Sequence, residues 1–151
     1  MSKAEAAAKA EERRQGERWV PVRWYDVDGK GVIATLPSDG QRPSYRAWWR
    51  NLPPEAFVSF EEAKRWLADR GSRGIEAAEY ERRSGITTAT VRRYGDAWEW
   101  ELFAGPGAHA PVRVGPFRAA DAAVAMKAAE RVAEAIRQSV ADTWDSWRER
   151  I

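Results

Sequence analysis

The spacing of apolar residues changes from a helical period to a strand-like period in the first part of the chain. Residues 3–15 are rich in Ala, Glu, Lys and Arg and predict a helix with no large apolar side chain to bury. Apolar and polar positions then alternate over 19–25, which is typical of a half-buried strand. An Asp-Gly pair at 28–29 predicts a tight turn into a second strand over 32–36. A third strand is expected over 44–49, so the two adjacent tryptophans at its end should point to opposite faces.

A helix is expected after this first group of strands. Ser59 and Glu62 have the spacing of a capping box, in which each side chain bonds the backbone amide of the other residue. The helical period that follows predicts a helix over 60–70, and Gly71 should end it. A short helix is then predicted over 75–83.

The second half of the chain shows a similar succession of strands. Strands are predicted over 88–94, 98–102 and 112–114, separated by glycine-containing turns. In the middle strand two tryptophans and a leucine alternate with Glu99 and Glu101, so we expect an apolar buried face and a solvated polar face.

The chain ends in a predicted long amphipathic helix. Apolar residues recur every four positions from Val124 to Val140. This helix either runs unbroken to about Arg148 or restarts at Asp142, which is a favourable N-cap.

These elements predict an α+β protein made of two degenerate βββα units, each an antiparallel sheet with a covering helix. A similar placement of Phe and acidic residues in segments 57–63 and 117–123 suggests that the two units are repeats. The predicted parts are an Ala-rich N-terminal helix or extension at 1–17, a first βββα unit at 18–70, a short helix and linker at 71–87, and a second βββα unit with the long C-terminal helix at 88–151.

The composition excludes several classes of chemistry and indicates a cytoplasmic protein. The chain has no cysteine, which removes disulfides, thiolate metal sites and cysteine nucleophiles and favours a reducing compartment. Hydrophobic residues make up 44% of the chain, which is enough for a folded core. The sequence shows neither a secretory signal nor an apolar run long enough to span a membrane.

The sequence favours a binding protein over an enzyme, with no metal and no cofactor. It contains no phosphate-binding loop, dinucleotide fingerprint or nucleophile elbow. The loop that begins at Asp26 has some of the acidic spacing of a calcium site, but Lys30 and Pro37 stand where oxygen ligands are needed. His109 is the one histidine, and no nucleophile or orienting acid is marked for it.

Two stretches combine arginine with aromatic or hydroxyl residues and contain no acid. Segment 41–50 has three arginines and three aromatics, and segment 82–94 has four arginines with several threonines. Arginine can bind phosphates while aromatic rings stack on bases, so the first hypothesis is a nucleic-acid-binding accessory protein for DNA or RNA. The alternative for segment 41–50 is a surface strand with solvated arginines, from which Trp48 or Trp49 enters the core. The alternative for segment 82–94 is a linker followed by a surface strand. The predicted contact residues are Arg23, Arg42, Tyr45, Arg46, Trp48, Arg50, Arg92 and Arg93.

The predicted order of elements resembles that of small DNA-binding modules such as integrase arm domains, in topology alone. With the N-terminal helix included, the first unit also resembles double-stranded-RNA-binding domains in element order. It departs from them at Ser59-Phe60-Glu61-Glu62, which is acidic where those domains have a lysine-rich helix start.

A protein–protein adaptor or inhibitor, of phage or mobile-element type, is the competing hypothesis. Trp144 and Trp147 lie three positions apart in the final helix, where they either complete the core or form a patch for a partner or for a homo-oligomer.

Overall fold

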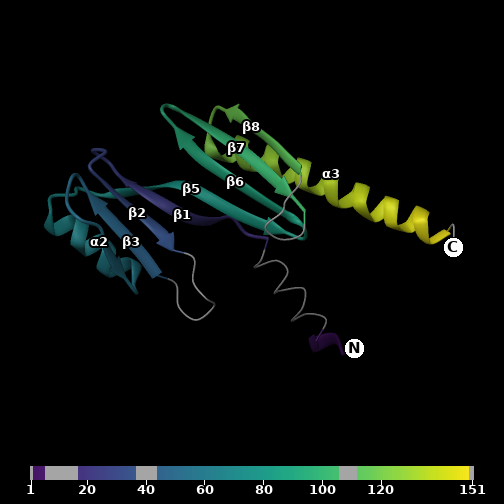
Figure 1. Cartoon of the computed structure of the whole chain (residues 1–151), viewed down its shortest axis with the longest axis horizontal. Coiled ribbons are helices and arrows are strands. Elements are labelled where there is room, and N and C mark those ends of the chain that lie inside the picture. Colours follow the sequence, from purple (N-terminus) through teal and green to yellow (C-terminus); the bar gives the residue numbers. More distant parts are fainter. Residues whose placement is uncertain (1, 6–16, 37–43, 106–111, 150–151) are drawn as a thin grey trace. The chain divides into compact units, whose positions relative to one another are not determined.

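The computed structural model describes residues 2–5, 17–36, 44–105 and 112–149, and leaves out the side chains of residues 144, 147 and 148. The elements in chain order are β1 (Val20–Asp26), β2 (Gly31–Leu36), β3 (Ser44–Trp49), β4 (Glu55–Phe57), α2 (Phe60–Asp69), β5 (Ile75–Ser84), β6 (Thr87–Tyr94), β7 (Ala97–Ala104), β8 (Val112–Ala119) and α3 (Ala122–Glu149). The protein is therefore α+β, with an eight-stranded antiparallel sheet and a long C-terminal helix (Figure 1).

The strands are hydrogen-bonded in the order β4-β3-β2-β1-β5-β6-β7-β8. Two compact units divide the chain. The first unit comprises Pro21–Tyr80, and the second comprises Met1–Val20 together with Glu81–Ile151. Strand β5 contributes its first part to the first unit and its end to the second.

In the first unit, α2 covers one face of the strands β1 to β4 (Figure 1). Ile33 on β2 lies opposite Trp24 on β1 and Ala47 on β3, so these three residues share the face that packs on the helix. Alternation along the strands sends every second side chain to this face. The fully or nearly buried core residues of the unit are Ile33, Ala47, Trp49, Ala63, Trp66 and Leu67.

The predicted capping box forms at the start of α2. The Ser59 hydroxyl accepts a hydrogen bond from the Glu62 amide at 3.2 Å, and the helix begins at the next residue as expected. Ala63, Trp66 and Leu67 are buried on one face, as the helical period predicted. The helix ends at Asp69, and Gly71 follows with a φ of 111°, a conformation that favours glycine.

Close packing between α2 and β2 requires a glycine at position 31. A Cβ atom added there would lie 2.8 Å from the ring of Trp49 and 2.9 Å from a methyl group of Leu67. Both neighbours are core residues with little room to move, so the sheet and the helix can approach this closely only because residue 31 has no side chain.

In the second unit, α3 packs on one face of β6, β7 and β8 (Figure 1). The strand side of the core is formed by Val91, Trp100 and Leu102 with small neighbours. The helix buries Ala125, Ala129 and Ala133, which lie one helical turn apart. These alanines are offset by one position from the predicted apolar series, whose members Val124 and Val140 are about half exposed. Alanine occupies the contact because it allows the helix axis to approach the large strand residues closely.

The final helix runs unbroken to Glu149, which settles the two alternatives for its course. The Asp121 carboxylate accepts a hydrogen bond from the Val124 amide at 2.9 Å and thereby satisfies one of the free amides at the helix start.

The segment predicted as a short helix over 75–83 is instead the strand β5. Its Glu and Ala residues favour a helix locally. In the folded chain the segment lies between β1 and β6, so both of its edges are paired with other strands. Tertiary pairing outweighs the local preference of this segment.

The two predicted βββα repeats are not confirmed as units. The first group of strands includes a fourth strand, β4, immediately before the helix, and β5 joins the two groups. The second group has the expected three strands followed by a helix.

Of the predicted N-terminal helix, residues 3–5 are helical, and residues 6–16 lie outside the described part of the chain. Within the described residues, no helix is both long enough and apolar enough to cross a membrane.

Candidate functional site

The face of the first unit that is turned away from α2, which we call the open face, brings together several of the predicted contact residues. Arg23 on β1 lies opposite Ala34 on β2, and Ala34 lies opposite Arg46 on β3. The two arginines are therefore aligned in one row across three strands. Both are exposed, whereas Ala34 between them is only 6% exposed.

A second row on the open face is aromatic. Tyr25 on β1 lies opposite Val32 on β2, and Val32 lies opposite Trp48 on β3. All three side chains are half-buried. Trp49, the neighbour of Trp48, is buried in the core, so the adjacent tryptophans do point to opposite faces as predicted.

The two rows together form a regular array of two cations and two aromatic rings, which we call the Arg/aromatic array (Arg23, Tyr25, Arg46 and Trp48). Strands in a sheet are about 4.8 Å apart, so the members of each row are separated by about 10 Å. Residues two positions apart on a strand are separated by about 7 Å, so the arginine row and the aromatic row run parallel at that distance.

The arginines of the array have no side-chain partner among the described residues. Within the described part of the chain, the side chains of Arg23 and Arg46 form no hydrogen bond, ion pair or ring contact. Strands β1 to β4 place no acidic residue on the open face. Within the described residues, this surface therefore offers two guanidinium groups that form no ion pair with an acidic side chain.

Arg50 lies at the end of the same strand as Arg46. It is exposed, and its backbone has a left-handed φ of 48°, a conformation that costs a non-glycine residue roughly 1–2 kcal/mol. Its amide donates a hydrogen bond to the carbonyl oxygen of Lys30 at 2.9 Å, and this bond holds the turn in place. Like the two arginines of the array, Arg50 forms no side-chain hydrogen bond or ion pair within the described residues.

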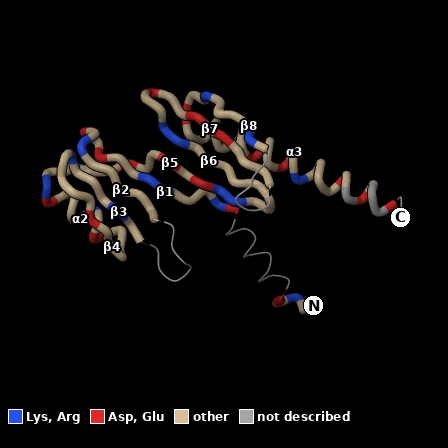
Figure 2. Tube along the Cα trace, in the orientation of Figure 1, with Lys and Arg blue, Asp and Glu red and all other residues tan. Residues whose placement is uncertain are grey.

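Arg92 differs from these arginines because it is neutralised by two acids. It lies opposite Glu99 and donates to the carboxylate at 2.7 Å, and a second nitrogen lies 2.9 Å from Glu101. Figure 2 shows basic positions on β6 and acidic positions on the neighbouring β7. Burial alone would lower the pKa of Arg92, but the hydrogen bond that it donates to Glu99 and the charge of Glu101 raise it above its ordinary value. This arginine is held in an internal network and is poorly placed to bind a phosphate.

Glu101 is buried at the centre of that network, contrary to the predicted solvated face. It is 6% exposed, and Arg113 also donates to its carboxylate at 2.8 Å. Burial by itself would raise the pKa of Glu101, but the hydrogen bonds of Arg113 and the charge of Arg92 hold it below its ordinary value. A carboxylate held ionised by two arginines is unsuited to general-base chemistry at neutral pH.

Of the remaining predicted contact residues, the structure describes Tyr45 and Arg93, and neither lies on the open face. Tyr45 lies on the face covered by α2, where its ring centroid is 5.7 Å from that of Phe60. Arg93 shares the α3 side of its strand with Trp98, the residue opposite it, and already has an interaction partner. Arg42 and the side chains of Trp144 and Trp147 lie outside the described residues.

Tyr25 is a candidate contact residue that the sequence hypothesis left out. Its position two residues after Arg23 places it on the same face of β1. The strand alternation contained this signal, but Tyr25 lies outside the two basic segments at 41–50 and 82–94.

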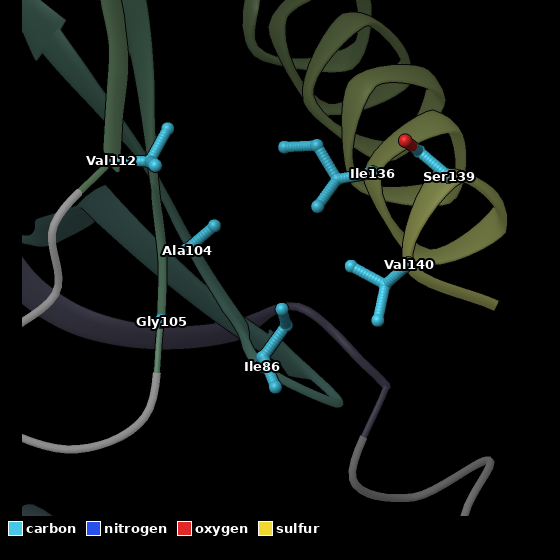
Figure 3. A pocket seen from close by; sticks show the side chains of 7 residues that line it. All are labelled: Ile86, Ala104, Gly105, Val112, Ile136, Ser139 and Val140. Atoms are coloured by element: carbon cyan, nitrogen blue, oxygen red, sulfur yellow. The ribbon is translucent and has the colours of Figure 1, made fainter. Parts of the chain in front are cut away.

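A pocket in the second unit is a different candidate site (Figure 3). It encloses about 330 Å³ between the sheet and the part of α3 that begins to leave it. One hydroxyl, that of Ser139, interrupts its apolar lining. The lining residues are Ile86, Ala104, Gly105, Val112, Ile136, Ser139 and Val140.

The described residues hold no group of three His, Asp or Glu side chains that could bind a metal ion. His109 lies outside them. The sequence matches no known protein family, and comparisons with curated proteins and with solved structures found no significant similarity. The chemistry and geometry of the two candidate sites therefore carry the assignment of function.

Proposed function

We propose that this protein is a non-catalytic accessory protein that binds nucleic acid through the open face of its first unit. The observation that carries the proposal is the pairing state of the arginines. Arg23 and Arg46 are exposed and have no acidic partner in the part of the chain that the structure describes, whereas Arg92 is fully engaged by Glu99 and Glu101. Unpaired guanidinium groups beside aromatic rings are suited to phosphates and bases.

Measuring the binding of labelled DNA and RNA by fluorescence anisotropy, at low and at physiological salt, tests this function. The protein should bind saturably, and its affinity should fall steeply as salt increases because bound phosphates release counterions. The double variant Arg23→Glu with Arg46→Glu should lose binding while remaining folded.

A matched control variant is available on the helix of the same unit. Lys64 and Arg65 are both exposed on α2, on the opposite side of the sheet from the array. Changing both to Glu alters the net charge by the same amount as the double arginine variant. If the two double variants lose affinity equally, the contribution is one of overall charge and the proposed site is wrong.

The proposal retains two predictions made from the sequence, a cytoplasmic setting and an origin of the two units by repetition. A cytoplasmic setting is favoured by the complete lack of cysteine. An origin of the two units by repetition is supported by the strand before each helix, since Phe57 and Phe117 each lie on the helix-facing side of that strand and contact a tryptophan.

Protein binding through α3 is the second candidate function, and the apolar pocket is the observation that favours it. Val140 at its edge is 50% exposed, and Val112 is 48% exposed. A partner's apolar side chain would fill such a pocket. The test is a co-purification assay after nuclease treatment, which compares Val140→Asp with Ala135→Asp, an exposed position on the same helix. Loss of a defined partner with the first variant alone would support this function.

A further inference from the structure

We infer that the open face selects single-stranded over double-stranded nucleic acid. This inference rests on the proposed function and deepens it, because it specifies the form of the ligand. Three features of the first unit lead to it: the width of the sheet, the parallel course of the two rows in the array, and the small side chains between the members of each row.

The sheet is too wide to enter a groove of duplex DNA. Strands β4, β3, β2, β1 and β5 lie side by side, and five strands spaced at about 4.8 Å span about 19 Å. The major groove is about 12 Å wide and admits a helix or a two-stranded ribbon. Unless the duplex is strongly distorted, it offers only its phosphates to this face, and its paired and stacked bases are not available to the aromatic row.

The array matches the layout of a single polynucleotide strand. In a single strand the phosphates follow one line and the unpaired bases lie along a parallel line. The array has an arginine row (Arg23 and Arg46) and, about 7 Å away along the strands, an aromatic row (Tyr25 and Trp48). A strand that crosses β1, β2 and β3 can therefore bring phosphates to the arginines while its bases reach the two rings.

The β2 side chains between the members of the array are small enough to let bases approach the rings. Between the two arginines lies Ala34, and between the two aromatic residues lies Val32. Neither side chain is large enough to stand above its neighbours. Stacking on such aromatic platforms is tolerant of base identity, so we expect weak sequence preference and binding of both DNA and RNA single strands.

The test uses the full chain with fluorescein-labelled oligo(dT), oligo(rU) and a mixed-sequence DNA duplex of equal length, titrated by anisotropy at physiological salt. The single strands should bind at least about tenfold more tightly than the duplex. Trp48→Leu and Tyr25→Leu should each weaken single-strand binding by about tenfold, since stacking of one base contributes about that factor. Trp48→Phe should restore most of the affinity because it retains an aromatic face.

The outcomes separate this inference from the proposed function. If single strands and duplex bind equally, and Arg46→Glu weakens binding while Trp48→Leu and Tyr25→Leu do not, the single-strand inference is overturned and the nucleic-acid function stands. If no oligonucleotide binds, or if Arg23→Glu and Arg46→Glu bind as well as the wild type, both fail. Should Trp48→Leu not fold, the comparison of single strand with duplex on the wild-type chain decides the matter alone. The relative affinities for oligo(dT) and oligo(rU) show whether DNA or RNA is preferred.

Discussion

The hydroxyl of Ser72 donates a hydrogen bond to the carboxylate of Asp26, a residue 46 positions earlier in the chain. Asp26 is only 2% exposed, and its other carboxylate oxygen accepts bonds from the amides of Asp28 and Lys30 at 3.1 and 3.2 Å. One side chain thus holds the turn between β1 and β2 against the segment that leads into β5. This arrangement fixes the end of β1, the strand that carries Arg23 and Tyr25.

We expect Asp26→Ala to lower the free energy of unfolding by about 1–3 kcal/mol, because it leaves three part-buried donors without their acceptor. Urea denaturation followed by tryptophan fluorescence measures this change. Asp28→Ala is the control, since Asp28 pairs with exposed Arg73 and an exposed ion pair contributes little to stability. Equal losses for the two variants would contradict the role assigned to Asp26.

Arg46→Ala should reduce the salt dependence of nucleic-acid binding as well as the affinity. Each phosphate contact that is lost decreases the slope of log affinity against log salt by about one. Arg92→Ala should leave that slope unchanged, since Arg92 is already paired with Glu99 and Glu101. Anisotropy titrations over a series of salt concentrations give both slopes. An unchanged slope for Arg46→Ala would remove this residue from the interface.

Stability should depend on pH through Glu101. Its pKa in the folded protein lies below the ordinary value of 4.5, so in acid the unfolded chain binds the proton more readily than the folded chain does. The stabilisation is therefore complete above the ordinary pKa and is lost as the pH falls through the lower, folded-state pKa.

Glu101→Gln tests this linkage, because glutamine does not titrate. The variant should be less stable at neutral pH, since Arg92 and Arg113 lose their acidic partner. Its stability should also decrease less than that of the wild type between about pH 5 and pH 2. Urea midpoints across this range measure both effects. Parallel pH profiles would show that other carboxylates cause the acid sensitivity.

The contact between α3 and its sheet should be intolerant of larger side chains. Ala129 is fully buried against β6 and β7, so Ala129→Leu should lower the free energy of unfolding by about 1–3 kcal/mol through overpacking. Ala123 is exposed on the same helix, and Ala123→Leu serves as the matched control with little expected change. Thermal unfolding by circular dichroism distinguishes the two. If Ala129→Leu is as stable as the wild type, this contact is looser than the structure indicates.

Local patterns in the sequence determined most of the individual elements. The alternation in β1, the Asp-Gly turn at 28–29 and the Ser59 cap all appear where they were expected. Each of these signals depends on residues within a few positions of one another, so the sequence contains the whole physical cause. The same alternation also places Arg23, Arg46 and Trp48 on one face once the register of their strands is known.

Contacts between distant segments decided the features of the fold and of the candidate site that local patterns could not predict. Segment Ile75–Ser84 has a helix-favouring composition but forms the strand β5, because β1 and β6 pair with its two edges. The register of β6 against β7 paired Arg92 with Glu99, whereas Arg23 on β1 forms no side-chain ion pair within the described residues, although both arginines lie on predicted strands. Tyr45 turned towards Phe60 because α2 packs on its side of β3. Strand order and register bring together residues that the sequence keeps apart, so only the tertiary structure could separate the arginines that stabilise the fold from those available to a ligand.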